Sequence, residues 1–137
     1  RRWRLLVGGG DDRLETLRRA APAHVVLDPP RPDFRQMLYH AAASVSLCGY
    51  NTALDILQAG TPAVFVPFDA GNEVEQGLRA DSLSALPAIT ALPGAELTPD
   101  SLDRAIARVT ARGRRDPRGL RDDGAAETVR ICERMVG

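Results

Sequence analysis

Lysine is absent from the sequence, and all 18 basic residues are arginines. The acidic residues also number 18, so the formal net charge at pH 7 is zero. Proteins that bind nucleic acids or anionic membranes usually carry an excess of positive charge. This balance gives no sign of either partner, and we expect no nucleic acid to bind.

Cysteines and long apolar segments are also scarce. The two cysteines, Cys48 and Cys132, do not make a disulfide framework, and neither has a neighbour at metal-ligand spacing. No apolar segment approaches the roughly 20 residues that span a bilayer. We therefore expect a cytoplasmic protein without a metal site.

The length and composition suit a single core. Of the 137 residues, 44% are hydrophobic, enough for one globular domain. The chain begins with Arg1-Arg2-Trp3 rather than methionine and soon enters an apolar segment. We expect residues 1–137 to form a single domain that is a fragment of a longer protein.

Short apolar segments alternate with amphipathic ones along the chain. Strands are predicted over residues 3–7, 23–27, 44–47, 63–66 and 88–90. Helices are predicted to begin near 11–12 and 33, to cover 52–59 and about 73–83, to begin again at 97–100, and to cover about 124–135. Apolar strands separated by helices are typical of a parallel sheet covered on both faces. The predicted fold class is α/β, a doubly wound, Rossmann-like three-layer sandwich that binds ligands beyond the carboxyl ends of its strands.

The first candidate site is the loop Gly8-Gly9-Gly10, which precedes a predicted helix and could approach a phosphate closely. A dinucleotide fingerprint needs a third glycine where this chain has Arg13, although Asp28 lies where that motif places its ribose-binding acid. Asp11 and Asp12 would cap the turn and repel a phosphate. We expect this loop to be at most a wall of the site.

The second candidate is the junction between the third strand and the third helix. Gly49 allows a sharp turn, Asn51 and Thr52 can donate hydrogen bonds, and the helix start exposes unpaired amides, a combination that suits a pyrophosphate. Asp55 can accept two hydrogen bonds from a vicinal diol. The alternative is structural: Asn51 is an ordinary N-cap, and Asp55 is a favourable partner of the helix dipole. The residues alone leave both interpretations open.

The segment CGYNTALDILQAGTPAVFVPF resembles the donor-binding segment of GT-B glycosyltransferases. These are the MurG-type N-acetylglucosaminyltransferases of family 28, the UDP-glycosyltransferases of plants and animals, and a bacterial group of family-28-like transferases. The shared features are a glycine turn, a small polar pair, an acid, a Gly-x-Pro, an apolar strand ending in proline and a final acid-Gln; here they are Gly49, Asn51-Thr52, Asp55, Gly60-Thr61-Pro62, Val64 to Pro67 and Glu75-Gln76. Upstream, RPDF at 31–34 has the family's spacing. The resemblance covers nearly the whole chain and is most specific over 30–76.

The resemblance implies a role for each matched residue. Asp55 would bind the ribose hydroxyls, and Gly49, Asn51 and Thr52 would hold the diphosphate. The remaining expected donor contacts are Pro30 and Arg31 at the base, Glu75 and Gln76 at the transferred sugar, and Gly9 and Gly10 at the wall of the site. Two positions depart from the family: the acid is Asp rather than Glu, and Leu47 replaces a basic or imidazole side chain, so an arginine or another chain must supply the cation.

The resemblance also implies the reaction. A hexosyl group, such as N-acetylglucosaminyl, would move from a UDP-sugar to an acceptor hydroxyl with inversion and without a metal or other cofactor. The general base would belong to an N-terminal acceptor-binding domain, in cis or as a separate subunit, so no catalytic residue is assigned here and the isolated chain would be inactive. The full-length enzyme would be cytoplasmic or peripheral at the inner membrane.

Two other functions remain open. One is half of a UDP-sugar epimerase, for which the necessary acid and base residues are not found. The other is a non-catalytic dinucleotide-binding domain that uses the loop at 8–10. We expect His24 and His40 to be structural or exposed, Cys48 to be a packing residue, and the arginine-rich segment 112–121 to be a solvated connector.

Overall fold

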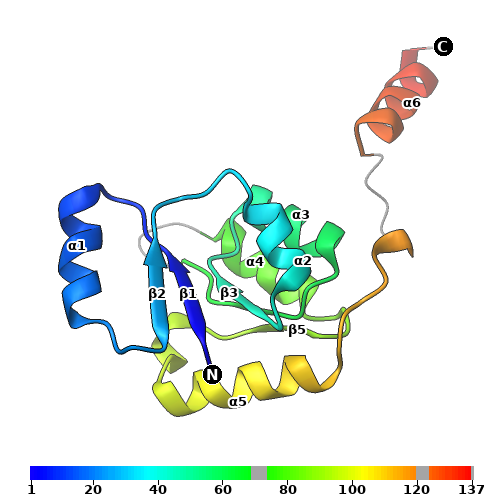
Figure 1. Cartoon of the computed structure of the whole chain (residues 1–137). Helices are drawn as coiled ribbons and strands as arrows, with labels where there is room; N and C mark the ends of the chain where they lie inside the picture. Colours follow the sequence, from blue (N-terminus) through cyan, green and yellow to red (C-terminus); the bar gives the residue numbers. More distant parts are fainter. Residues whose placement is uncertain (69–73, 120–123, 137) are drawn as a thin grey trace. The chain divides into compact units, whose positions relative to one another are not determined.

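The computed structural model describes residues 1–68, 74–119 and 124–136 (Figure 1). The chain divides into two compact units, Arg1–His40 and Ala41–Gly137, and each is described by itself. That both belong to one donor-binding domain stays a prediction.

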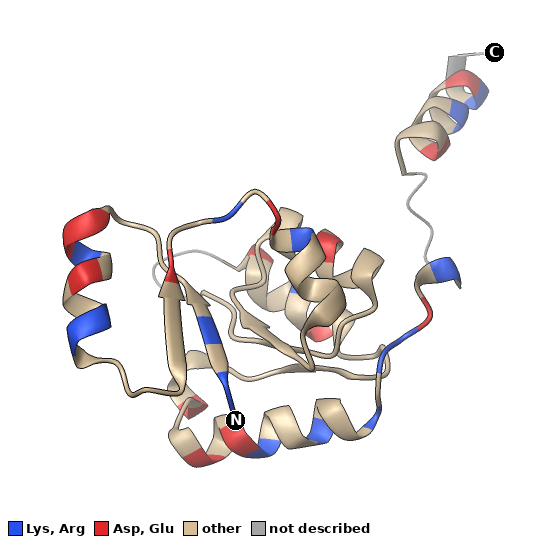
Figure 2. Ribbon diagram, viewed as in Figure 1, with Lys and Arg blue, Asp and Glu red and all other residues tan. Residues whose placement is uncertain are grey.

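The first unit contains β1 (Trp3–Leu6), α1 (Asp11–Ala20), β2 (Val25–Asp28) and α2 (Phe34–His40). The two strands pair in parallel over their whole length. α1 carries acidic residues in its first turn and basic residues in its last, as Figure 2 shows, which complements the helix dipole. Arg18 donates from Nε and Nη2 to the Leu27 carbonyl at 3.1 and 2.9 Å. This pair of bonds ties α1 to β2.

The second unit contains β3 (Ser44–Ser46), α3 (Tyr50–Ala59), β4 (Ala63–Phe65), α4 (Glu75–Leu83), β5 (Ile89–Ala91), η1 (Gly94–Glu96), α5 (Pro99–Ala111), η2 (Pro117–Gly119) and α6 (Gly124–Val136). Its parallel sheet has the order β3-β4-β5. The central strand β4 is completely buried, which explains its unbroken apolar sequence.

α5 shows how local sequence signals position a helix. Thr98 Oγ1 accepts a hydrogen bond from the Ser101 amide at 3.1 Å, and Ser101 Oγ accepts one from the Thr98 amide at 2.9 Å, which completes a capping box. The predicted apolar face of α5 packs into the core, where Ala105, Ile106 and Val109 are buried. This helix contacts β4 and β5.

The α/β class with parallel strands and intervening helices is confirmed. The strand pairings are parallel within each unit, β1 with β2 in the first and β3-β4-β5 in the second, in agreement with the predicted Rossmann-like fold. α3 begins at Tyr50, two residues before the predicted start at Thr52. No helix within the described ranges is long and apolar enough to cross a bilayer.

Candidate functional site

The site is built around the start of α3, immediately after β3. The Ala53 amide donates to the Gly49 carbonyl at 2.9 Å, which makes Gly49 the N-cap and leaves the preceding amides at the open end of the helix. Among the described residues, no side chain caps this end. The structural alternative in which Asn51 is the N-cap is therefore wrong.

Gly49 itself has φ −63° and ψ 149°, an extended conformation that any residue can adopt. The turn at Gly49 therefore does not depend on the left-handed conformation that favours glycine. A Cβ at this position would meet nothing within 4 Å in the described structure. The glycine leaves space in front of the helix rather than allowing an unusual backbone.

The helical spacing brings Asn51, Thr52 and Asp55 onto one face of α3, because residues three and four apart are neighbours. Asn51 is exposed, whereas Thr52 and Asp55 are half-buried. Asp55 is the sixth residue of the helix, beyond the first turn, where the helix dipole has little effect on a charge. The arrangement can offer amides to an anion and, one turn further on, a carboxylate to hydroxyl groups.

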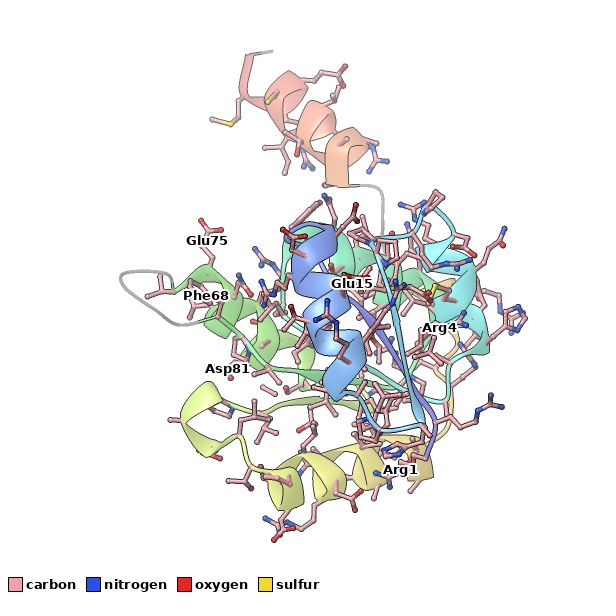
Figure 3. All side chains as sticks on the ribbon, turned by 60° about the vertical axis from the view of Figure 1, so that its left-hand side comes forward. Arg1, Arg4, Glu15, Phe68, Glu75 and Asp81 are labelled. Carbon is pink, nitrogen blue, oxygen red and sulfur yellow. The ribbon has the colours of Figure 1, made fainter. Side chains whose placement is uncertain are left out.

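Gln76, from the first turn of α4, holds the loops that follow β3 and β4. Its Oε1 accepts hydrogen bonds from the Cys48 amide at 3.1 Å and from the Phe68 amide at 3.3 Å. The predicted contact of Gln76 with a sugar is therefore left to its Nε2 group, which donates. Glu75 projects outward with a side chain 80% exposed (Figure 3).

Arg79, one turn further along α4, contacts the same loop. Its Nη1 donates to the Cys48 carbonyl at 2.7 Å, and its Cζ lies 5.9 Å from the centroid of the Tyr50 ring. Cys48 is fully buried, as expected for a packing residue. Burial raises the pKa of the Cys48 thiol, while the positive charge of Arg79 acts in the opposite direction.

The C-terminal end of α3 is held by the arginine-rich segment. Arg114 donates from Nη1 to the Ala59 carbonyl at 3.1 Å and from Nη2 to the Ala41 carbonyl at 2.9 Å. Arg115 donates from Nη2 to the Ile56 carbonyl at 3.1 Å, and its burial lowers the pKa of its guanidinium. The prediction of a solvated connector is therefore wrong for these two residues, which satisfy carbonyls at the helix end.

In the first unit, Gly9 and Gly10 precede α1 with φ values of 102° and 90°. The Arg13 side chain lies over Gly9, where a Cβ would come within 3.1 Å of its Cδ. Asp28 Oδ2 lies 3.3 Å from Arg4 Nε. A carboxylate already paired with a guanidinium is poorly suited to a ribose, which weakens the dinucleotide interpretation.

Pro30 and Arg31 are both exposed in the first unit. Arg31 makes two hydrogen bonds of 2.8 Å to the Asp33 carboxylate, which raise the pKa of Arg31 and lower that of Asp33. With its guanidinium so engaged, a base contact through main-chain groups remains the prediction. His24 and His40 are exposed, in agreement with expectation.

A search of curated proteins found no match to the chain. Residues 13–126 match the family described as the glycosyltransferase family 28 C-terminal domain. The chain belongs to this family. The crystal structure of MurG from Acinetobacter baumannii superposes with a TM-score of 0.67 at 19% sequence identity, over 96% of this chain and 41% of that chain. At this identity the likeness shows the fold, and the present chain spans about two fifths of that protein.

Family membership confirms the resemblance inferred from the segment around Gly49, while the role of each residue stays a prediction. For this family 28 domain, sequence reasoning missed Arg79, Arg114 and Arg115 as contacts of α3. The lack of lysine and of a basic residue at position 47 indicated that an arginine or another chain must supply a positive charge near the loop, but nothing in the sequence singled out Arg79. Among the described residues, no three His, Cys, Asp or Glu side chains are grouped to hold a metal ion; metal-free binding stays a prediction.

Proposed function

We propose that this family 28 domain binds the UDP-sugar donor of an inverting glycosyltransferase, which transfers a hexosyl group such as N-acetylglucosaminyl to an acceptor hydroxyl. The observation that carries the proposal is the start of α3, where no described side chain caps the amides and Asn51, Thr52 and Asp55 share a face. Both structural explanations for these residues are weakened, because Gly49 is the N-cap and Asp55 lies beyond the first turn.

The proposed chemistry follows from charge development. As the bond between the sugar and the diphosphate breaks, the sugar acquires oxocarbenium character and the diphosphate gains negative charge. Amides at a helix start stabilise that charge without reorganisation. Gly49, Asn51 and Thr52 would hold the diphosphate, and Asp55 would accept hydrogen bonds from the ribose. The general base would come from an N-terminal acceptor domain, joined in cis or separate.

Calorimetric titration with UDP, UDP-N-acetylglucosamine and NAD tests the proposal. The two uridine nucleotides should bind and NAD should not. Asp55→Ala should weaken UDP binding about tenfold or more, because a charged acceptor of hydrogen bonds is lost. Asp81→Ala, at an exposed acid of α4, is the matched control and should bind as the wild type does.

Three results would contradict the proposal or a part of it. Binding of NAD that depends on Asp28, with no binding of uridine nucleotides, would favour the dinucleotide-binding alternative. Equal UDP affinity of wild type and Asp55→Ala would remove Asp55 from the site. Transfer of sugar by the isolated chain would show that the base lies within it, contrary to expectation.

A further inference from the structure

The Arg79 side chain contacts both sides of the turn that precedes α3. Arg79 bonds the carbonyl of Cys48, the residue before the N-cap, and its Cζ lies 5.9 Å from the ring of Tyr50, the first residue of the helix. Its two contacts therefore lie on either side of Gly49. The positive charge is fixed beside the helix start rather than carried on a loose side chain.

The turn is held from α4 by two side chains spaced three residues apart, which places them on one face of that helix. Gln76 accepts from the Cys48 amide, and Arg79 donates to the Cys48 carbonyl. Both backbone polar groups of Cys48 are thus paired, and its side chain is fully buried. A turn fixed in this way is pre-organised, so little conformational entropy remains to be lost when a ligand binds.

The Arg79 guanidinium can do more than hold the turn. An arginine guanidinium is a cation with five N–H donors, and the bond to the Cys48 carbonyl uses one of them. Glu75 Oε2 lies 3.7 Å from Arg79 Nη2, but the Glu75 side chain is 80% exposed, and such surface pairs contribute little. The Arg79 side chain is 26% exposed, so solvent or a ligand can reach it.

We propose that Arg79 is the positioning residue of the donor site, fixing the turn before α3 and supplying the positive charge that the diphosphate requires. This inference rests on the proposed function. The chain has no lysine, and the loop carries Leu47, 54% exposed, where relatives have a basic or imidazole side chain. Arg79 would supply the positive charge that is missing there. The helix start contributes only partial charges, whereas a guanidinium binds phosphate oxygens through charge-assisted hydrogen bonds.

The test uses ligands of increasing negative charge to separate two roles of Arg79, its charge near the phosphates and its support of the turn. Uridine, UMP and UDP are titrated into the wild type and into Arg79→Met, Arg79→Lys and Arg104→Met; the last removes an exposed arginine of α5. Arg79→Met should weaken UDP about tenfold, UMP less, and uridine less than about twofold. Arg79→Lys should recover part of the UDP affinity, and the loss in Arg79→Met should shrink as salt is added. Arg104→Met should bind all three as the wild type does.

The outcomes separate a failure of the proposed function from a failure of the role of Arg79. If the wild type binds no uridine nucleotide, the proposed function fails and this inference fails with it. If UDP binds and Arg79→Met binds it equally well, only the inference is overturned. If both Arg79 variants lose the three ligands equally, with lower unfolding temperatures, Arg79 is merely structural and the inference is again overturned.

Discussion

The two ends of α3 are built in opposite ways. At the C-terminal end, Gly60 adopts φ 66°, and Arg114 and Arg115 donate to carbonyls of the last turns. At the other end, Gly49 has an ordinary extended conformation, and no described side chain caps the helix. A helix fixed firmly at one end can leave its amides open at the other without losing its position, which is the condition that binding an anion requires.

The largest effect should come from Gly60→Ala. An alanine Cβ would lie 2.3 Å from the Arg115 carbonyl oxygen, and φ 66° is unfavourable for any residue with a Cβ. We expect a loss of about 2 kcal/mol or more in the free energy of unfolding, measured by urea denaturation. Gly77→Ala is the matched control, because its Cβ would meet nothing within 4 Å inside α4, and it should stabilise by about 0.5–1 kcal/mol. Similar losses in both variants would contradict the idea of a locked C-terminal end.

Arg114→Met should have the next largest effect. Arg114 donates to Ala59, Ala41 and the Thr61 hydroxyl, and losing charged hydrogen bonds of this kind costs about 1–3 kcal/mol. Arg115→Met should cost less, because Nε and Nη1 of Arg115 are buried without a hydrogen-bond partner in the described structure, and methionine removes that penalty. Thermal unfolding of the two variants gives the order, and the reverse order would show that the Arg115 contact dominates.

Gly49→Ala tests the N-terminal end of α3. The backbone there suits alanine and the space is free, so the free energy of unfolding should change by less than about 1 kcal/mol. UDP affinity should fall nonetheless, because the new methyl group occupies the space before the first turn. Calorimetry and urea denaturation on the same sample separate the two effects. Unchanged UDP affinity would place the diphosphate elsewhere.

The smallest expected effect is the contribution of the Cys48 thiol to the pH dependence of stability. Cys48 is buried and Cys132 exposed, so a thiol reagent should modify Cys132 in the folded chain and both only after unfolding. Burial raises the pKa of Cys48, so its contribution to stability is complete below the unfolded value of about 8.5 and is lost as the pH rises through the folded value. Cys48→Ala should abolish this part of the pH dependence. Rapid modification of both thiols at pH 7 would contradict the burial.

Local signals predicted the order of helices and strands well, since caps and apolar spacing act between near neighbours. The stripe on α5 and the glycine that ends α3 are examples. The start of α3 was misplaced because glycine and asparagine are both acceptable N-caps, and nothing local chooses between Gly49 and Asn51. The order β3-β4-β5 depends on strand pairing, which apolar patterns do not encode.

The contacts that hold the candidate site are mostly distant in sequence. Arg114 lies 55 residues from Ala59, and Gln76 lies 28 residues from Cys48. No periodicity links such positions, and an arginine-rich segment gives the same pattern whether it is solvated or caps a helix. The residue types of Asn51, Thr52 and Asp55 predict a candidate site, and the family resemblance is what favours ligand binding over the structural alternative.

The amide group of Gln76 has an orientation that follows from chemistry. Two backbone N–H groups point at one of its terminal atoms, and only oxygen can accept from them, so the NH₂ end must face away. An inhibitor designed for this site should therefore present a carbonyl, sulfonyl or ether oxygen to that position. A sugar hydroxyl would accept there through its oxygen, whereas an ammonium group, which has no lone pair, would meet only another donor.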